Sequence, residues 1–138
     1  MRRLLALLLL ACAGTAGAQA PCPEAWEVTT EQMLGVWHAQ FAGEWDTTIV
    51  LLEKHPDYAG NFRGGVKRAG GVSQATGDVD EGDFTLEESA DGVHITAAWI
   101  GEVVDGSCGK EIRGTWKADG AKEGKDFVLR KVTPAAPR

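Results

Sequence analysis

The chain has 138 residues and a formal net charge of −6, and 43% of its residues are apolar, enough to build a folded core. A chain of this length forms one domain around one core. Its acidic balance argues against nucleic acid as a partner, because nucleic acid selects basic faces, and against anionic lipid surfaces.

The first twenty residues have the pattern of a secretory signal peptide. Residues 1–3 are Met-Arg-Arg, and an unbroken apolar run follows over residues 4–11. Small residues then lead to an A-x-A cleavage pattern at residues 16–20. These features predict export, and the run is too short to cross a bilayer, which needs about 20 apolar residues. Removal of residues 1–20 takes away two arginines and no acid, so the mature net charge is expected to be −8.

Two processing alternatives remain open. Cleavage after Ala20 fits the small-x-small rule but leaves Pro21 first, whereas cleavage after Ala18 avoids that. Residues 9–12, Leu-Leu-Ala-Cys, also resemble a bacterial lipobox, in which Cys12 would carry a lipid anchor. The mature protein is therefore expected to be periplasmic or secreted or, as the alternative, anchored to the outer membrane through Cys12. Insertion into the membrane is not expected.

The cysteines agree with export. Cys12 lies in the signal segment, which leaves Cys22 and Cys108 as an even pair. Such pairs are normally bridged in an oxidising compartment, so a Cys22–Cys108 disulfide is predicted. No Cys/His spacing suggests zinc, and no cofactor is expected.

After the signal segment the chain has the pattern of an all-β domain over residues 21–132. A short helical turn comes first, because Thr29 and Gln32 have capping-box spacing just before Met33. Segments that alternate apolar with polar residues follow, separated by Gly- and Asp-rich turns. The expected strands cover residues 36–42, 47–54, 61–68, 72–79, 84–88, 93–104, 111–118 and 125–132. Residues 133–138 are expected to form a disordered tail.

One face of each expected strand is apolar and the other is polar. Eight antiparallel strands with short connections and one apolar face favour an up-and-down barrel, with a two-sheet sandwich as the alternative. The inward set is predicted to be Trp37, Phe41, Phe62, Val66, Phe84, Leu86, Ile95, Trp99, Ile112, Trp116, Phe127 and Leu129. In a meander, the N-terminal segment and the loop after the sixth strand lie at the same end, which brings Cys22 near Cys108.

Gly35-Val36-Trp37, which opens the first strand after a helical turn, resembles the G-x-W motif of the lipocalins. Gly-Thr-Trp at residues 114–116 is similar to avidin-like barrels. The chain thus resembles the calycins, the group of lipocalins, fatty-acid-binding proteins and avidins. The resemblance implies a ligand-binding barrel in which Arg130 packs over Trp37, although strand alternation points Arg130 outward.

Two functions are carried forward. The first is binding of a small apolar or aromatic molecule at an open barrel end rimmed by Phe41, Trp45, Ile95, Trp116 and Phe127, without convergent polar groups. The alternative is a periplasmic inhibitor or interaction module with a packed interior, which would meet a protein target through loops such as residues 55–60.

Neither an enzyme nor a metal site is expected. His38 and His94 are predicted to face outward and His55 to lie in a loop, and no Ser-His-Asp arrangement is visible. The acidic segment 78–83 departs from the EF-hand pattern, because its fifth and sixth positions are Gly82 and Asp83 in reversed order. A hairpin turn explains this segment better than a calcium loop.

Overall fold

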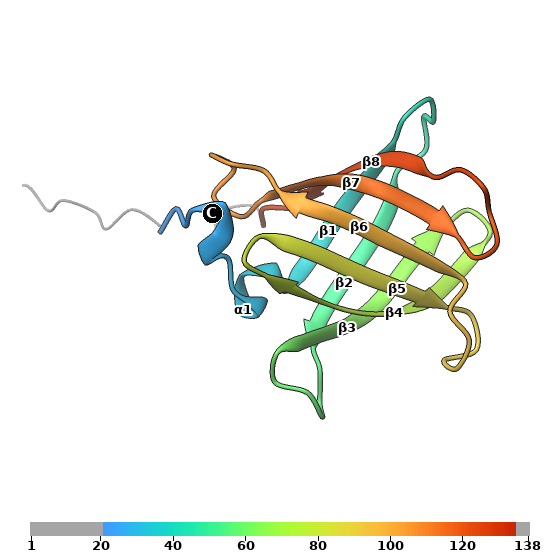
Figure 1. Ribbon diagram of the computed structural model, residues 1–138, viewed down its shortest axis with the longest axis horizontal. Coiled ribbons are helices and arrows are strands. Elements are labelled where there is room, and N and C mark those ends of the chain that lie inside the picture. Colours follow the sequence, from blue (N-terminus) through green and yellow to red (C-terminus); the bar gives the residue numbers. More distant parts are fainter. Residues whose placement is uncertain (1–20, 135–138) are drawn as a thin grey trace, which may run out of the picture.

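The computed structural model describes residues 21–134, and these form a closed antiparallel barrel (Figure 1). Each strand pairs with the next along the chain, and β1 closes the barrel against β8. The strands are β1 Gly35–Phe41, β2 Thr48–Lys54, β3 Asn61–Arg68, β4 Gly71–Asp80, β5 Asp83–Ser89, β6 Ala97–Val103, β7 Glu111–Ala118 and β8 Lys125–Lys131. The barrel prediction is confirmed, and the sandwich alternative is wrong. The expected signal peptide and the Cys12 lipobox lie outside the described residues, as do residues 135–138 of the expected tail.

The sixth strand starts later than its sequence pattern predicts. Residues 93–96 were expected to extend it, but β6 begins at Ala97. Asp91 competes for this backbone, because its carboxylate accepts the N–H groups of Val93 and His94, both at 2.8 Å. An Asp side chain that bonds backbone two or three residues onward stabilises a loop in place of a strand. Ile95 consequently stands 46% exposed, so its predicted inward position is wrong.

The rest of the predicted inward face fills the barrel. Ten of the twelve expected side chains are buried, and Trp116 is half-buried at one end. The largest completely buried side chains are Trp37, Trp99, Phe62 and Phe84. They interlock along the axis: the rings of Phe62 and Phe84 stack 5.9 Å apart, and those of Trp99 and Phe127 meet edge to face at 4.8 Å. An eight-stranded barrel is narrow enough for side chains to fill it, and this one is filled through its middle.

The segment before β1 seals one end of the barrel. It contains a 3₁₀ turn, η1 (Ala25–Glu27), and one helical turn, α1 (Thr30–Met33), which lies at the left end of the barrel in Figure 1. The predicted capping box is present, since the Thr29 N–H donates to the Gln32 side chain at 2.9 Å. The Trp37 indole N–H donates to the Met33 carbonyl at 2.8 Å, which ties α1 to the core. Gly35 joins α1 to β1 with φ of +127°, a conformation that favours glycine.

The disulfide prediction is confirmed at this sealed end. Cys22 and Cys108 are bonded, with their Cα atoms 4.4 Å apart and 86 positions apart in sequence. The bond ties the N-terminal segment to the β6–β7 loop, as a meander requires.

A cation lies over Trp37, but it comes from Lys131 and not from Arg130. Lys131 Nζ is 5.9 Å from the Trp37 ring and donates to the Gln32 carbonyl at 2.6 Å. Arg130 points outward and donates to Glu111 at 2.9 Å. Strand alternation decides this, because Leu129 and Lys131 share the inward side of β8 and Arg130 falls between them. The placement of Arg130 over Trp37 that the resemblance implied is therefore wrong.

The acidic segment 78–83 is a hairpin, as predicted. Glu81 and Gly82 form a two-residue connection between β4 and β5, and both have positive φ, +48° and +87°. Within residues 21–134, no group of three or more His, Cys, Asp or Glu side chains is arranged to hold a metal ion. No helix in that range is long and apolar enough to cross a membrane.

Candidate ligand-binding site

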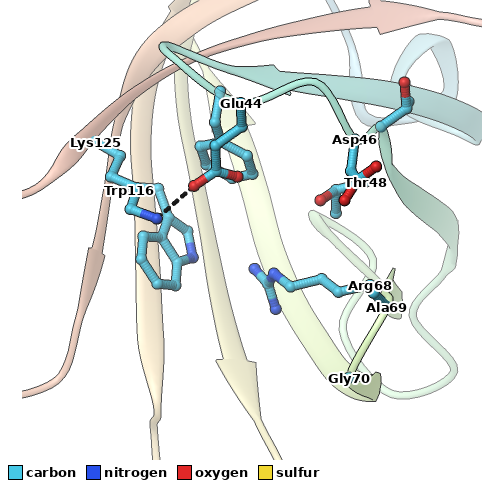
Figure 2. A pocket seen from close by; sticks show the side chains of 10 residues that line it. Glu44, Asp46, Thr48, Arg68, Ala69, Gly70, Trp116 and Lys125 are labelled. Atoms are coloured by element: carbon cyan, nitrogen blue, oxygen red, sulfur yellow. Dashed lines mark hydrogen bonds and ion pairs between the residues drawn. The ribbon is translucent and has the colours of Figure 1, made fainter.

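The end of the barrel opposite α1 carries a pocket of about 250 Å³. We call this end the mouth; it holds the β1–β2, β3–β4, β5–β6 and β7–β8 connections. The pocket is formed where five of the eight strands and two of these connections meet. Its lining residues are Phe41, Glu44, Asp46, Thr47, Thr48, Arg68, Ala69, Gly70, Trp116 and Lys125 (Figure 2).

A buried carboxylate lies beneath the pocket. Glu88, in β5, is 1% exposed and points into the barrel. Arg68 donates to both of its oxygens, at 2.5 and 2.6 Å. Two indole N–H groups complete the set, from Trp99 at 2.8 Å and Trp116 at 2.7 Å, both to Oε2. We call these four side chains the Glu88 network.

The Glu88 network keeps the carboxyl group ionised. Burial alone would raise the pKa of Glu88, but the hydrogen bonds from Arg68 and Trp116, the positive charge of Arg68 and the hydrogen bond from Trp99 together lower it. Arg68 is only partly covered, with 31% of its side chain exposed. The network is therefore a charged pair that is sealed on the Glu88 side and open to the pocket on the Arg68 side.

Aromatic and charged side chains are interleaved around the pocket. The Arg68 guanidinium lies 5.3 Å and Lys125 Nζ 5.9 Å from the centre of the Trp116 ring. Lys125 is also paired with Glu44 at 2.5 Å, across the top of the pocket in Figure 2. Phe41 meets the edge of Trp116 at 5.9 Å and closes the floor. The pocket thus offers aromatic surface together with hydrogen-bond donors and acceptors.

The structure places the five predicted site residues differently from one another. Phe41 and Trp116 line the pocket. Phe127 is 2% exposed and lies deeper in the barrel. Trp45 is 98% exposed on the β1–β2 connection, between two lining residues. Ile95 lines a separate hollow on the outer wall, with residues of β6 and of the β7–β8 connection.

The sequence prediction missed the polar half of the site. The sequence prediction did not include the polar side chains of Arg68, Glu88, Glu44 and Lys125. The expectation that the mouth lacks convergent polar groups is therefore wrong. Strand alternation carried a signal for two of them: Phe84 and Leu86 face inward, so Glu88 does too, and Val66 is followed on the same face by Arg68. An inward acid and an inward arginine at the same barrel end predict a buried pair.

Further hollows lie on the outside of the barrel. One of about 530 Å³ runs over the outer face of β5, β6 and β7 and is bordered by exposed side chains such as Ile100 and Glu102. The mouth pocket differs because it opens onto a buried, charged network.

No known protein-family model matches this chain, and no curated protein is significantly similar to it in sequence. The chemistry of the mouth pocket is therefore the basis on which its function is interpreted.

Proposed function

We propose that this protein is an exported, non-enzymatic binding protein that takes a small molecule at the mouth of the barrel. The observation that carries the proposal is the Glu88 network directly beneath the pocket. Replacing a buried ion pair with apolar side chains of similar volume is often neutral or stabilising, so stability alone gives a barrel little reason to keep one. A network that holds the Arg68 guanidinium and the Trp116 ring at the pocket wall has a clear use in ligand recognition.

The filled interior limits how such a ligand would bind. Trp99 and Phe127 occupy the space below the pocket, so the ligand would sit in the mouth and not deep in the barrel. Its apolar side would contact Phe41 and Trp116, as expected for an apolar or aromatic ligand. Its other side would meet charged groups, so a purely apolar molecule would leave these desolvated without compensation. The proposed ligand is therefore small, with one apolar face and several polar groups.

The disulfide supports export. Bonds of this kind persist in oxidising compartments and are rare in the cytosol, which fits a periplasmic or secreted protein. Attachment to the outer membrane through Cys12 is the alternative form of the same proposal.

A native mass spectrum of the protein, recovered from its own host without refolding, tests the binding proposal. An adduct of a few hundred daltons is the expected result. Gly70→Trp should remove the adduct, because Gly70 lines the pocket and an indole there would take the space of the ligand. The variant should fold, since a Cβ at Gly70 has no other atom within 4 Å. Gly60→Trp is the matched control, since Gly60 is equally uncrowded but lies in the β2–β3 loop at the opposite end. An adduct that survives in Gly70→Trp would contradict the proposed site.

A second function, inhibition of a protein target through a loop, has its own supporting observation. Tyr58 is 65% exposed in the β2–β3 loop. His55 Nδ1 accepts the N–H groups of Asp57 and Tyr58 at 3.1 and 3.2 Å, and its ring packs 4.9 Å from that of Tyr58. A loop held in this way presents an aromatic side chain at little entropic cost. Loss of a co-purifying protein in Tyr58→Ala, with no effect of Gly70→Trp, would favour this function over the first.

A further inference from the structure

We propose that the ligand of the mouth pocket is a neutral, hydroxyl-rich ring, such as one sugar residue, and that Trp45 covers it from outside. This inference rests on the binding function proposed above and specifies the class of ligand.

The charges around the pocket argue against an anionic ligand. Each lining cation already has an acidic partner: Arg68 is paired with Glu88, and Lys125 with Glu44. Asp46 adds a further carboxylate, so with Glu88 beneath the pocket there are three acids against two bases. An incoming anion would meet this excess of negative charge without a free cation to bind it.

The same pairing disfavours a strongly cationic ligand. Glu44 and Glu88 are neutralised by Lys125 and Arg68. Both cations lie within 6 Å of the centre of the Trp116 ring and would repel a ligand cation placed there. Only Asp46 is left, and it is exposed to solvent, where an ion pair contributes little. The lining therefore favours neither an anionic nor a cationic ligand.

Hydroxyl groups match what the lining offers. Arg68 and Lys125 can only donate hydrogen bonds, whereas the Glu44 and Asp46 carboxylates can only accept them. Thr47 and Thr48 can do both. A hydroxyl is donor and acceptor at once, so a ring that carries several hydroxyls can bond to either kind of wall in any order around the pocket. A ligand with fixed donors or fixed acceptors would satisfy only half of them.

The remaining surfaces and the size fit one ring. Trp116 and Phe41 supply an apolar wall against which the C–H face of a sugar ring can pack. The pocket volume of about 250 Å³ lies below the range of about 300–1,000 Å³ found for drug-sized ligands. One sugar residue, free or at the end of a longer glycan, is the scale of ligand that such a pocket can hold.

Trp45 is positioned to form the outer wall. It is 98% exposed, yet Glu44 before it and Asp46 after it both line the pocket. Gly43, just before this stretch, has φ of +79°, a conformation natural to glycine at a turn. If the indole closed over a ligand, part of its apolar surface would be removed from water, which is favourable. Trp45 would then sandwich the ring against Trp116.

The test is ligand-observed NMR with the full mature chain and a panel of neutral sugars: glucose, galactose, mannose and N-acetylglucosamine. Glucosamine and glucuronic acid serve as the cationic and anionic counterparts of glucose, and an aromatic sulfonate dye as the apolar probe. At least one neutral sugar should bind, at least tenfold more tightly than its charged counterparts. Gly70→Trp should abolish binding, and Gly60→Trp should not.

The role of Trp45 is tested separately. Trp45→Ala should weaken the bound sugar about tenfold, which is the size of one aromatic contact. Trp26→Ala is the matched control, because Trp26 is 65% exposed in η1 at the sealed end, and it should leave affinity unchanged. Equal effects of the two variants would overturn the covering role of Trp45.

The outcomes separate this inference from the binding function. If no neutral sugar binds, or if a charged counterpart or the dye binds more tightly, the sugar assignment is overturned. A native-mass adduct of another chemical class that Gly70→Trp removes would overturn the sugar assignment and leave the binding function standing. The absence of any adduct, together with no binding by any member of the panel, would overturn both.

Discussion

Replacing Arg68 by methionine removes the charge that sustains the Glu88 network and nearly preserves the side-chain volume. Glu88 would remain buried, with only the Trp99 and Trp116 indole N–H groups as partners. Removing one partner of a buried ion pair costs about 3–5 kcal/mol, because the other charge is left uncompensated. Arg68 is 31% exposed, so we reduce this to about 3 kcal/mol at pH 7.

The loss should depend on pH with a definite sign. In the native protein the pKa of Glu88 is lowered, so its contribution to stability is present above the usual value of 4.5 and is lost as the pH falls below it. In Arg68→Met the main lowering causes are gone, and burial raises the pKa of Glu88. The variant's Glu88 contribution is then fully present below 4.5 and is lost as the pH rises. The difference in stability between the two proteins therefore shrinks as the pH falls from 7 to 4.

Urea unfolding at pH 7 and pH 4, followed by tryptophan fluorescence, measures this difference. With a slope of about 1.5 kcal/mol per molar urea, a loss of 3 kcal/mol lowers the midpoint by about 2 M at pH 7. Arg130→Met is the control, because Arg130 is paired with Glu111 on the surface, and its loss should cost no more than about 1 kcal/mol at either pH. Equal destabilisation of Arg68→Met at both pH values would refute the argument that Glu88 is a buried, ionised carboxylate.

Three further predictions concern the frame that holds the mouth. Replacing Cys22 and Cys108 together by alanine should lower the free energy of unfolding by about 4–5 kcal/mol, because the bond closes a loop of 86 positions. The melting temperature should fall by about 15–20 °C. An unchanged melting temperature would show that the disulfide contributes little. Gly114→Ala should destabilise the barrel by about 1–3 kcal/mol or more, since its Cβ would lie 2.0 Å from the Ile100 carbonyl oxygen. Gly60→Ala is the control: Gly60 has open space around it, so this change should leave the melting temperature nearly unchanged. Trp37→Phe should lower the free energy of unfolding, measured in urea, by about 1–2 kcal/mol, because the buried Met33 carbonyl would lose its hydrogen-bond donor. A change near zero would show that this hydrogen bond does not stabilise the contact between α1 and β1.

The sequence by itself determined the properties that depend on neighbouring residues. Alternation with a period of two places Trp37, Phe62 and Ile112 on one face of their strands, and all three are completely buried. Turn residues end the strands at positions that match the structure to within one residue, except at the start of β6. The disulfide could also be predicted. In an up-and-down barrel successive loops lie at alternate ends, so the loop after the sixth strand lies at the same end as the N-terminal segment.

The tertiary structure alone decided which inward side chains meet. Arg68 and Glu88 lie on β3 and β5, with β4 between them, and Trp116 reaches the same carboxylate from β7. Such contacts depend on strand tilt and on the stagger of the closed barrel, which no local pattern encodes. The same closure brings Trp99 and Phe127 together and fills the interior, while the pocket at the mouth opens onto the Glu88 network. Side-chain alternation is a property of one strand, whereas a binding site at the end of a barrel is a property of all of them together.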